Sequence, residues 1–172
     1  TTEYLELAKN FEALKPVNDK DWYPNYYAAY SYTLSAFTEK DHNKLDAILD
    51  LAQKHIDKAQ KISSENDEIL CVASMISSAR IIVNPEKRGY KFGQQSSSIL
   101  EKALLINSNN PRILFLIGQS KMYMPASYGG GCTNAKPVLE EAIKKFKTFN
   151  KIGVHSPDWG KEETLRLLKS CP

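Results

Sequence analysis

The sequence predicts an all-α protein built as a short stack of helix pairs. Apolar residues recur at the spacing that places them on one face of a helix. Proline and glycine divide the chain into blocks of helix length, and no stretch shows the alternating β-branched pattern of a strand. Apolar residues make up 42% and charged residues 25% of the chain, which is ordinary for a soluble globular protein. The chain is therefore expected to form a helical domain with a proper core.

The first three predicted helices follow from apolar periodicity and from signals at their ends. Residues 3–14 carry apolar side chains along one face, and Pro16 ends this helix. A second helix starts after Asp21 with Pro24 in its first turn, where a missing N–H is tolerated. Asp41 is the predicted N-cap of a long third helix, which ends near Ile62.

Five further helices are predicted in the rest of the chain. The residue before a proline avoids the α region, so Asn84-Pro85 is expected to end one helix and to leave Arg88-Gly89-Tyr90 in a loop. Gly129-Gly130-Gly131 is also expected to be a loop, because three glycines cost a helix roughly 3 kcal/mol relative to alanine. The expected helices cover residues 65–84, 94–106, 110–124, 135–149 and 157–170.

A packing pattern recurs along the chain. In three helices a small residue, a large apolar residue and an alanine fall on one face. In the first two of these helices, the residue 11 positions after the closing alanine is an apolar residue of the next helix. Leu70 follows Ala59 in this way, and Leu114 follows Ala103. Small residues let two helix backbones approach closely, and the large residue fills the remaining gap. The three occurrences are Ala52, Ile56 and Ala59; Ser96, Leu100 and Ala103; and Ala135, Leu139 and Ala142.

This pattern resembles the tetratricopeptide repeat over Pro24–Phe149 and predicts a single domain over residues 1–172, a short solenoid of three helix pairs. The units span about residues 24–62, 65–106 and 110–149, so they recur at about 40 residues, longer than the usual repeat of about 34. The added residues are expected between the two helices of each unit. Since solenoid units need neighbours to bury their faces, helices near residues 3–14 and 157–171 are expected to act as caps.

Several local motifs resemble those of a family of exported Bacteroidetes tetratricopeptide-like proteins, most of which have no assigned activity. Membership implies a signal peptide removed near Thr1 and a periplasmic or otherwise exported location, with a cytoplasmic location as the alternative. Cys132 departs from the usual pattern of that family. The motifs are Trp22-Tyr23-Pro24-x-Tyr26-Tyr27-Ala28-Ala29-Tyr30, Asn84-Pro85-x2-Arg88-Gly89, Asn110-Pro111-Arg112, Pro125-x2-Tyr128-Gly129-Gly130-Gly131 and Pro157-x-Trp159-Gly160.

Composition argues against several classes of function. The net charge is only +3, and the nearest basic group fits a solvated helix face, so no nucleic-acid partner is expected. No apolar stretch approaches the roughly 18 residues of a membrane span. The histidines show no zinc-type spacing and are expected to be ordinary surface residues, so no metal and no cofactor are predicted: His42, His55 and His155.

The cysteines allow one disulfide hypothesis. Cys132 precedes the helix expected at residues 135–149, and Cys171 ends the last helix. If these helices are antiparallel neighbours, the two cysteines lie close together, and a disulfide would suit an oxidising compartment. Two unbonded thiols are the alternative. Cys71, in the middle of an apolar helix, is expected to be a small packed side chain.

Two further segments have a structural and a functional interpretation. The three glycines at residues 129–131 favour a tight turn, and an anion bound at the following helix N-terminus is the alternative. The tyrosine-rich stretch from Trp22 to Tyr32 favours core packing, and a stacking platform for a sugar or peptide is the alternative. Tyr32 lies off the apolar stripe and is expected to be an exposed ring.

The first helix of each pair is expected to line a concave face. Aromatic, methionine and arginine side chains among small polar groups suit a peptide or a modest organic ligand. A plain solvated face is the alternative. The candidate binding residues are Asn25, Tyr32, Ser35, Glu68, Met75, Ser78, Arg112, Phe115, Gln119 and Met122.

The sequence thus predicts a non-catalytic interaction module that binds a protein or peptide on this concave face. The alternative is a small-ligand-binding component of an envelope transport system, which would need a closed apolar pocket rather than an open groove. An enzyme would need carboxylate, histidine or cysteine side chains from distant helices to meet in space, and no spacing in the sequence indicates such a cluster.

Overall fold

The computed structural model of the chain describes residues 2–151 and 153–171. Within these residues the regular structure is entirely helical, with eight α-helices and one short 3-10 helix. The all-α prediction is therefore confirmed. The chain forms two compact units, Thr1–Ile99 and Leu100–Pro172, with the boundary inside helix α5 (Pro85–Ile106). Each unit is described by itself.

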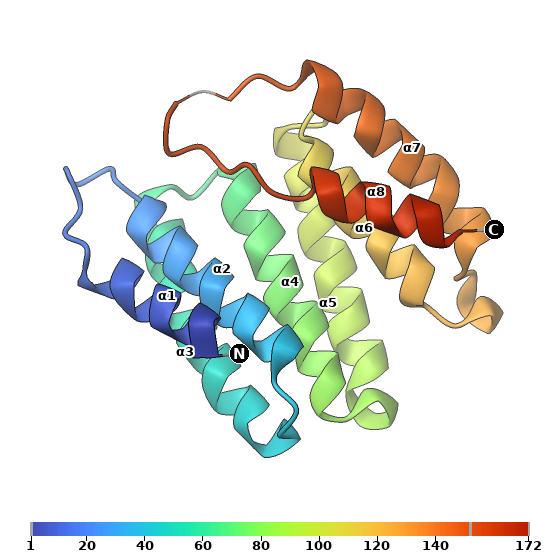
Figure 1. Cartoon of the computed structure of the whole chain (residues 1–172), viewed down its shortest axis with the longest axis horizontal. Coiled ribbons are helices and arrows are strands. Elements are labelled where there is room, and N and C mark those ends of the chain that lie inside the picture. The colour runs from blue at the N-terminus through green and yellow to red at the C-terminus, as the bar shows by residue number, and fades with distance from the viewer. Residues whose placement is uncertain (1, 152, 172) are drawn as a thin grey trace. The chain divides into compact units, whose positions relative to one another are not determined.

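The first unit contains four helices and the first part of α5. They are α1 (Thr2–Ala13), α2 (Tyr23–Thr38), α3 (His42–Ile62) and α4 (Asp67–Val83). Helix α2 contacts α1, α3 and α4, so it is covered on three sides (Figure 1). Its buried residues accordingly lie around most of its circumference and include small residues such as Ala28, Ala29 and Ser31.

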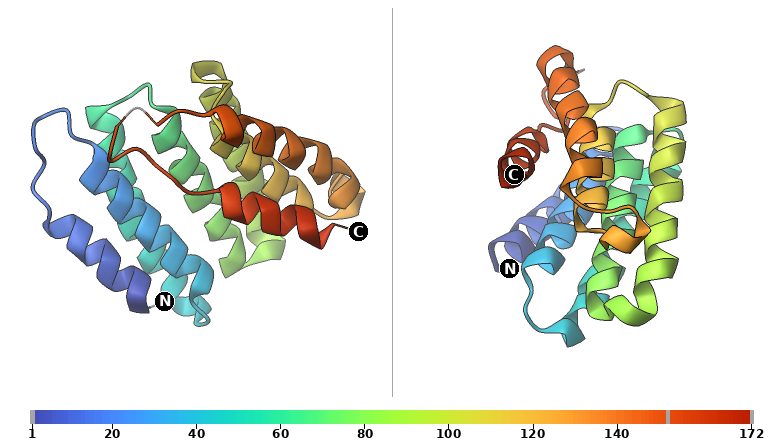
Figure 2. Two further views of the ribbon diagram at one scale, coloured as in Figure 1. Left: turned by 45° about the horizontal axis from the view of Figure 1, so that its top comes forward. Right: turned by 90° about the vertical axis from the view of Figure 1, so that its right-hand side faces the viewer.

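The second unit contains the end of α5 followed by α6 (Pro111–Tyr123), the 3-10 helix η1 (Ala126–Tyr128), α7 (Cys132–Thr148) and α8 (Lys161–Ser170). Helix α6 packs against α7, and the short α8 contacts both of them, as the views in Figure 2 show. The chain therefore has three consecutive helix pairs, α2–α3, α4–α5 and α6–α7, preceded by α1 and followed by α8.

Helix starts follow the predicted capping chemistry. The side chain of Asp41 accepts a hydrogen bond from the Asn43 amide, as expected for the N-cap of α3. Asn66 and Asn110 cap α4 and α6 in the same way. Pro24 lies in the first turn of α2, where its missing N–H leaves no helical hydrogen bond unmade.

Two predicted helix boundaries are wrong. The sequence predicts a loop within residues 85–93, but α5 begins at Pro85, because a proline fits the first turn of a helix and the Asn84 side chain accepts from the Lys87 amide. In the predicted repeat unit at residues 65–106, the residues beyond the usual repeat length therefore extend the second helix, α5, and not the turn between α4 and α5. The last helix begins at Lys161 and not near residue 157, because Gly160 has a left-handed φ of 100° that a helix cannot include.

The recurring packing pattern occupies the core. All nine of its residues are buried, from Ala52 in α3 to Ala142 in α7. Gly118 of α6 shows why small residues are required: a Cβ atom at this position would lie 2.5 Å from Cδ2 of the buried Leu139 in α7. In the pair before it, the Ser96 hydroxyl donates to the Ser74 carbonyl at 3.1 Å. Helix backbones thus approach closely at these positions.

Gly118→Val is expected to lower the free energy of unfolding by about 2 kcal/mol, because overpacking against Leu139 displaces a buried side chain. Gly93→Ala is the matched control. A methyl group added at Gly93 in α5 would meet no neighbouring atom within 4 Å, so alanine there should raise stability by about 0.5–1 kcal/mol. Chemical denaturation of both variants measures the difference, and equal effects would contradict the close approach of α6 and α7.

An ion-pair network joins α3, α4 and α5 within the first unit. The two terminal nitrogens of the Arg88 guanidinium lie 2.7 and 2.8 Å from the Asp46 carboxylate. The Arg80 guanidinium donates hydrogen bonds to Asp46 and Asp50. The hydrogen bond from Arg88 holds the pKa of Asp46 below its ordinary value of 3.8, against the smaller opposing effect of desolvation. Because the folded state favours the ionised carboxylate, this pair stabilises the fold above the ordinary pKa and loses its effect as the pH falls.

Asp46→Asn is expected to lower the free energy of unfolding at neutral pH by about 1 kcal/mol or less, since the pair is partly exposed. The difference from wild type should shrink as the pH falls through the depressed pKa of Asp46. Urea denaturation at several pH values measures this difference in the free energy of unfolding. Asp57→Asn, on the exposed side of α3, serves as the control, and the same pH profile in both variants would contradict the role of Asp46.

Candidate ligand-binding site

Six aromatic side chains form a continuous cluster at α1 and the start of α2. The ring centroids of Phe11 and Tyr27 are 5.1 Å apart and stacked, and Tyr23 stacks between Tyr27 and Trp22. Tyr26 meets Trp22 and Tyr27 edge-on and stacks with Tyr30. We call this group the aromatic cluster: Phe11, Trp22, Tyr23, Tyr26, Tyr27 and Tyr30.

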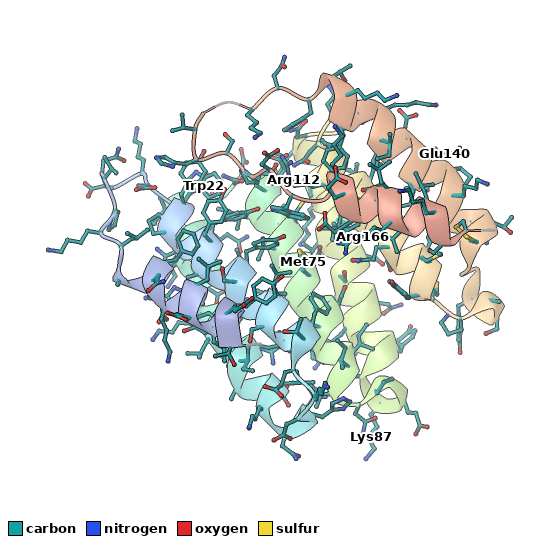
Figure 3. The ribbon with its side chains drawn as sticks, viewed as in Figure 1. Trp22, Met75, Lys87, Arg112, Glu140 and Arg166 are labelled. Atoms are coloured by element: carbon teal, nitrogen blue, oxygen red, sulfur yellow. A yellow bond between two sulfur atoms is a disulfide. The ribbon has the colours of Figure 1, made fainter. Side chains whose placement is uncertain are left out.

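The aromatic cluster is anchored in the core but open at its edge. Tyr26 is fully buried, whereas the other five rings are only partly covered. Trp22 lies at the N-terminal end of α2, as Figure 3 shows. Partly covered rings in a fixed arrangement leave apolar ring surface exposed, and a planar, conjugated ligand packs on such surface by offset or edge-to-face stacking. The tyrosine-rich stretch therefore contributes both to core packing and to a candidate stacking platform.

The expectation that Tyr32 is an exposed ring is wrong, because this side chain is only 3% exposed. Helix α2 is covered on three sides, so a residue off its apolar stripe still faces a neighbouring helix. The Tyr32 ring stacks on the imidazole of His55, with centroids 6.0 Å apart. Burial, the hydrogen bond with Glu12 and the charge of Glu12 together raise the pKa of Tyr32 to about 12.

His55 occupies the centre of a polar cluster that joins three helices. Its Nε2 atom lies 2.6 Å from Oε1 of Glu12 in α1, and its Nδ1 atom lies 3.0 Å from Oδ1 of Asn25 in α2. His55 is 6% exposed, so the prediction of a surface histidine is wrong at this position. His42 and His155 are exposed, as predicted. We call Glu12, Asn25, Tyr32 and His55 the polar cluster.

The predicted concave-face residues are covered by neighbouring helices. Six of them are buried: Tyr32, Ser35, Glu68, Met75, Arg112 and Phe115. The other four are half-buried: Asn25, Ser78, Gln119 and Met122. Several contact other parts of the protein. The Ser78 hydroxyl lies 3.0 Å from that of Ser96, and the Met122 sulfur lies 3.9 Å from that of Cys171. Periodicity groups residues on one face of a helix but does not show whether another helix covers that face.

In the second unit, Arg112 lies among aromatic rings. Its guanidinium is 4.9 Å from the centre of the Phe149 ring and 5.9 Å from that of Trp159, and the side chain is buried. Phe115 meets Trp159 edge-on. Gly160 allows this contact, since a Cβ atom there would lie 3.1 Å from Phe146 and 3.4 Å from Arg112. These contacts fasten the segment before α8 to α6, which indicates a structural role for Arg112.

The structure joins Cys132, at the start of α7, to Cys171, at the end of α8, in a disulfide whose Cα atoms are 5.5 Å apart. Figure 3 shows the sulfur–sulfur bond in yellow beside the end of α8. The glycine loop before Cys132 is a tight turn: the amide of Gly130 donates to Pro125 and that of Gly131 to Lys121. Because these amides already have backbone partners, the turn interpretation is favoured over anion binding at this loop.

Thiol counting under denaturing conditions tests the disulfide. The chain has three cysteines, so alkylation without reduction should modify Cys71 alone, and alkylation after reduction should modify all three. The double variant Cys132→Ser/Cys171→Ser should lose about 3–4 kcal/mol of stability, because the bond closes a loop with a sequence separation of 39. Cys71→Ser is the control for loss of a thiol. Three reactive thiols before reduction would contradict the pairing.

Metal-binding and membrane-spanning features are absent from the part of the chain that the structure describes. No group of three or more histidine, cysteine or acidic residues is placed to hold a metal ion in residues 2–151 and 153–171. Within the same residues, no helix is both long and apolar enough to cross a membrane.

The fold places the chain among all-α proteins built from packed helix pairs, with a cluster of aromatic rings at the start of α2. No family model matches the chain, and no curated protein matches its sequence. A solved structure, the HusA haemophore from Porphyromonas gingivalis, is similar at 34% identity with a TM-score of 0.86. The match covers 99% of this chain and 84% of that one. The chain therefore belongs to the family of HusA.

This membership refines the family expected from the sequence. An exported Bacteroidetes protein is compatible with it, since HusA comes from Porphyromonas gingivalis. The resemblance to the tetratricopeptide repeat receives no support from the comparisons, because no family model matches. The helix pairs and their small-residue contacts remain as structural facts, and the division into three repeat units remains a prediction.

Proposed function

We propose that this chain is an exported, non-catalytic protein that binds haem or a related porphyrin. The observation that carries the proposal is the 34% identity to the HusA haemophore over 99% of the chain. The disulfide between Cys132 and Cys171 supports an oxidising compartment outside the cytoplasm. This function corresponds to the small-ligand alternative and not to the protein- or peptide-binding module that the sequence favoured.

The aromatic cluster is the part of the first unit whose chemistry fits a porphyrin. A porphyrin is a flat, conjugated and largely apolar ring, and partly covered tyrosine and tryptophan side chains stack on such rings. Tyr23 and Tyr27 are stacked with each other and with Trp22 and Phe11, so a flat ligand meets several rings held in one arrangement. Preorganised rings lose little conformational entropy on binding, which favours affinity.

The residues present also fit haem as a group with an iron atom. Haem, if bound, would supply an iron atom, and a tyrosine phenolate is one side chain that would ligate it. The aromatic cluster contains four tyrosines: Tyr23, Tyr26, Tyr27 and Tyr30. Binding by stacking and binding by iron ligation are therefore separate contributions to affinity, and an iron-free porphyrin isolates the first.

The protein- or peptide-binding interpretation loses its main support. It depended on an open face lined by ten residues, and six of them are buried in the helical core. The similar structure, HusA, is described as a haemophore, and this description mentions no protein partner. The concave-face residues therefore remain a prediction about this chain, and the aromatic cluster replaces them as the proposed binding site.

Trp22→Leu and Tyr23→Leu are each expected to weaken porphyrin binding by about 3- to 10-fold, the range of one aromatic stacking contact. Titration of haemin and of iron-free protoporphyrin IX, followed by the Soret absorbance of the ligand, gives the affinity of each variant. Leucine preserves apolar volume, so circular dichroism should show an unchanged helical fold. A larger loss for haemin than for protoporphyrin IX would identify iron ligation by Tyr23.

Tyr128→Leu is the matched control, because this tyrosine is 77% exposed in the second unit and lies outside the aromatic cluster. Its affinity should equal that of wild type. If wild type binds neither porphyrin at micromolar concentrations, the proposed function is wrong. If Tyr128→Leu weakens binding as strongly as Trp22→Leu, the site lies elsewhere on the chain.

A further inference from the structure

Helix α1 packs extensively against α2. It buries one residue, Ala8, among those that the structure describes. At its C-terminal end, two consecutive side chains make specific contacts in the two clusters. Phe11 stacks on Tyr27 in the aromatic cluster, and Glu12 meets His55 in the polar cluster. Phe11 and Glu12 thus connect the same turn of α1 to the aromatic cluster and to the polar cluster.

The contact between Glu12 and His55 depends on a proton. Oxygen atoms of Glu12 and Asn25 face the two ring nitrogens of His55. Both of these oxygens are acceptors, and only the protonated imidazole can donate from both of its nitrogens. A neutral imidazole donates from one nitrogen and leaves the other facing an oxygen, unless the Asn25 amide turns. In either case the ion pair between the imidazolium and Glu12 is lost, and at most a weaker hydrogen bond from the neutral ring to the carboxylate is left.

The other charged groups near His55 do not replace this effect. Tyr32 of α2 keeps its proton through the range in which histidine titrates, because its pKa is about 12. On α3 itself, Lys54, Asp57 and Lys58 are exposed to solvent. Among the side-chain types of the polar cluster, imidazole is the one whose unperturbed titration range lies near neutral pH.

We propose that His55 and Glu12 are positioning residues that hold Phe11 in the aromatic cluster, and that porphyrin affinity falls when His55 loses its proton. This inference rests on the proposed function of the aromatic cluster. The protein binds most tightly when α1 is docked, and its apparent affinity decreases in proportion to the docked fraction. The pH dependence follows from the geometry of one buried imidazole and does not require a change in the ligand.

The test compares wild type with His55→Gln by titrating iron-free protoporphyrin IX at about pH 5.5, 7 and 8.5. A glutamine amide can donate to Glu12 at every pH, and the iron-free probe removes any ionisation of an iron-bound water. The ratio of the two dissociation constants at each pH cancels ionisation of the porphyrin itself. Wild-type affinity should fall by roughly 3- to 10-fold relative to His55→Gln as the pH rises, the range of one ordinary hydrogen bond.

Two variants serve as controls. His42→Gln removes an exposed histidine of the same helix and should retain the wild-type pH profile. Glu12→Gln removes the carboxylate from a partly exposed position and should flatten the profile as His55→Gln does. Parallel profiles for wild type, His55→Gln and Glu12→Gln would overturn the inference.

A ligand-free measurement separates this inference from the proposed function. In NMR spectra of the unliganded protein, the ring signals of Phe11 and Tyr27 should shift with the same midpoint as the His55 imidazole. These shifts should be absent in Glu12→Gln. If no variant binds porphyrin, the proposed function fails while the NMR titration still decides the role of His55. If the ring signals of Phe11 and Tyr27 do not shift together with the His55 imidazole signal, the inference about His55 is wrong even if porphyrin binds.

Discussion

Close approach of helix backbones is the constraint on which this structure depends. In the first unit, α2 is covered by α1, α3 and α4, and such a position requires small side chains around much of the helix. Ala28, Ala29 and Ser31 meet this requirement. A small side chain is required here even at the cost of an unpaired polar group. The buried hydroxyl of Ser35 has no hydrogen-bond partner among the described residues, an arrangement that ordinarily destabilises a protein.

The same constraint explains where the aromatic rings lie. Most of the aromatic rings of α2 gather at its start and along its contact with α1, whereas Tyr32 stacks on His55. There Tyr26 is enclosed, while Trp22, Tyr23 and Tyr27 keep part of their surface exposed. A core that requires small residues in its centre thus produces an aromatic surface at its margin. A planar ligand needs such a surface of rings already held in place.

The sequence predicted the helical class, the packing residues and most helix starts, because these depend on local periodicity and capping. The predicted helix boundary at Pro85 was wrong, because a proline is found both after the end of a helix and in the first turn of one. Here the Asn84 side chain accepts a hydrogen bond from the Lys87 amide, so Pro85 starts a helix. The predictions for Tyr32 and His55 failed for another reason. Their burial depends on α1, which covers α2 from outside the repeating pattern, and no local spacing encodes that contact.

The two ends of the chain show two ways to hold a peripheral helix. An isolated helix of 10 residues, such as α8, is unstable in water and needs tertiary contacts. Helix α8 buries one residue, Thr164, and is fixed by the disulfide to Cys132 and by the contacts of Arg112 with the segment before it. Helix α1 also buries one residue, but its end is held by Phe11 and Glu12. Helix α8 is thus held by a covalent bond, whereas α1 is held by non-covalent contacts alone. The helix beside the aromatic cluster is therefore the one on which the proposed protonation of His55 acts.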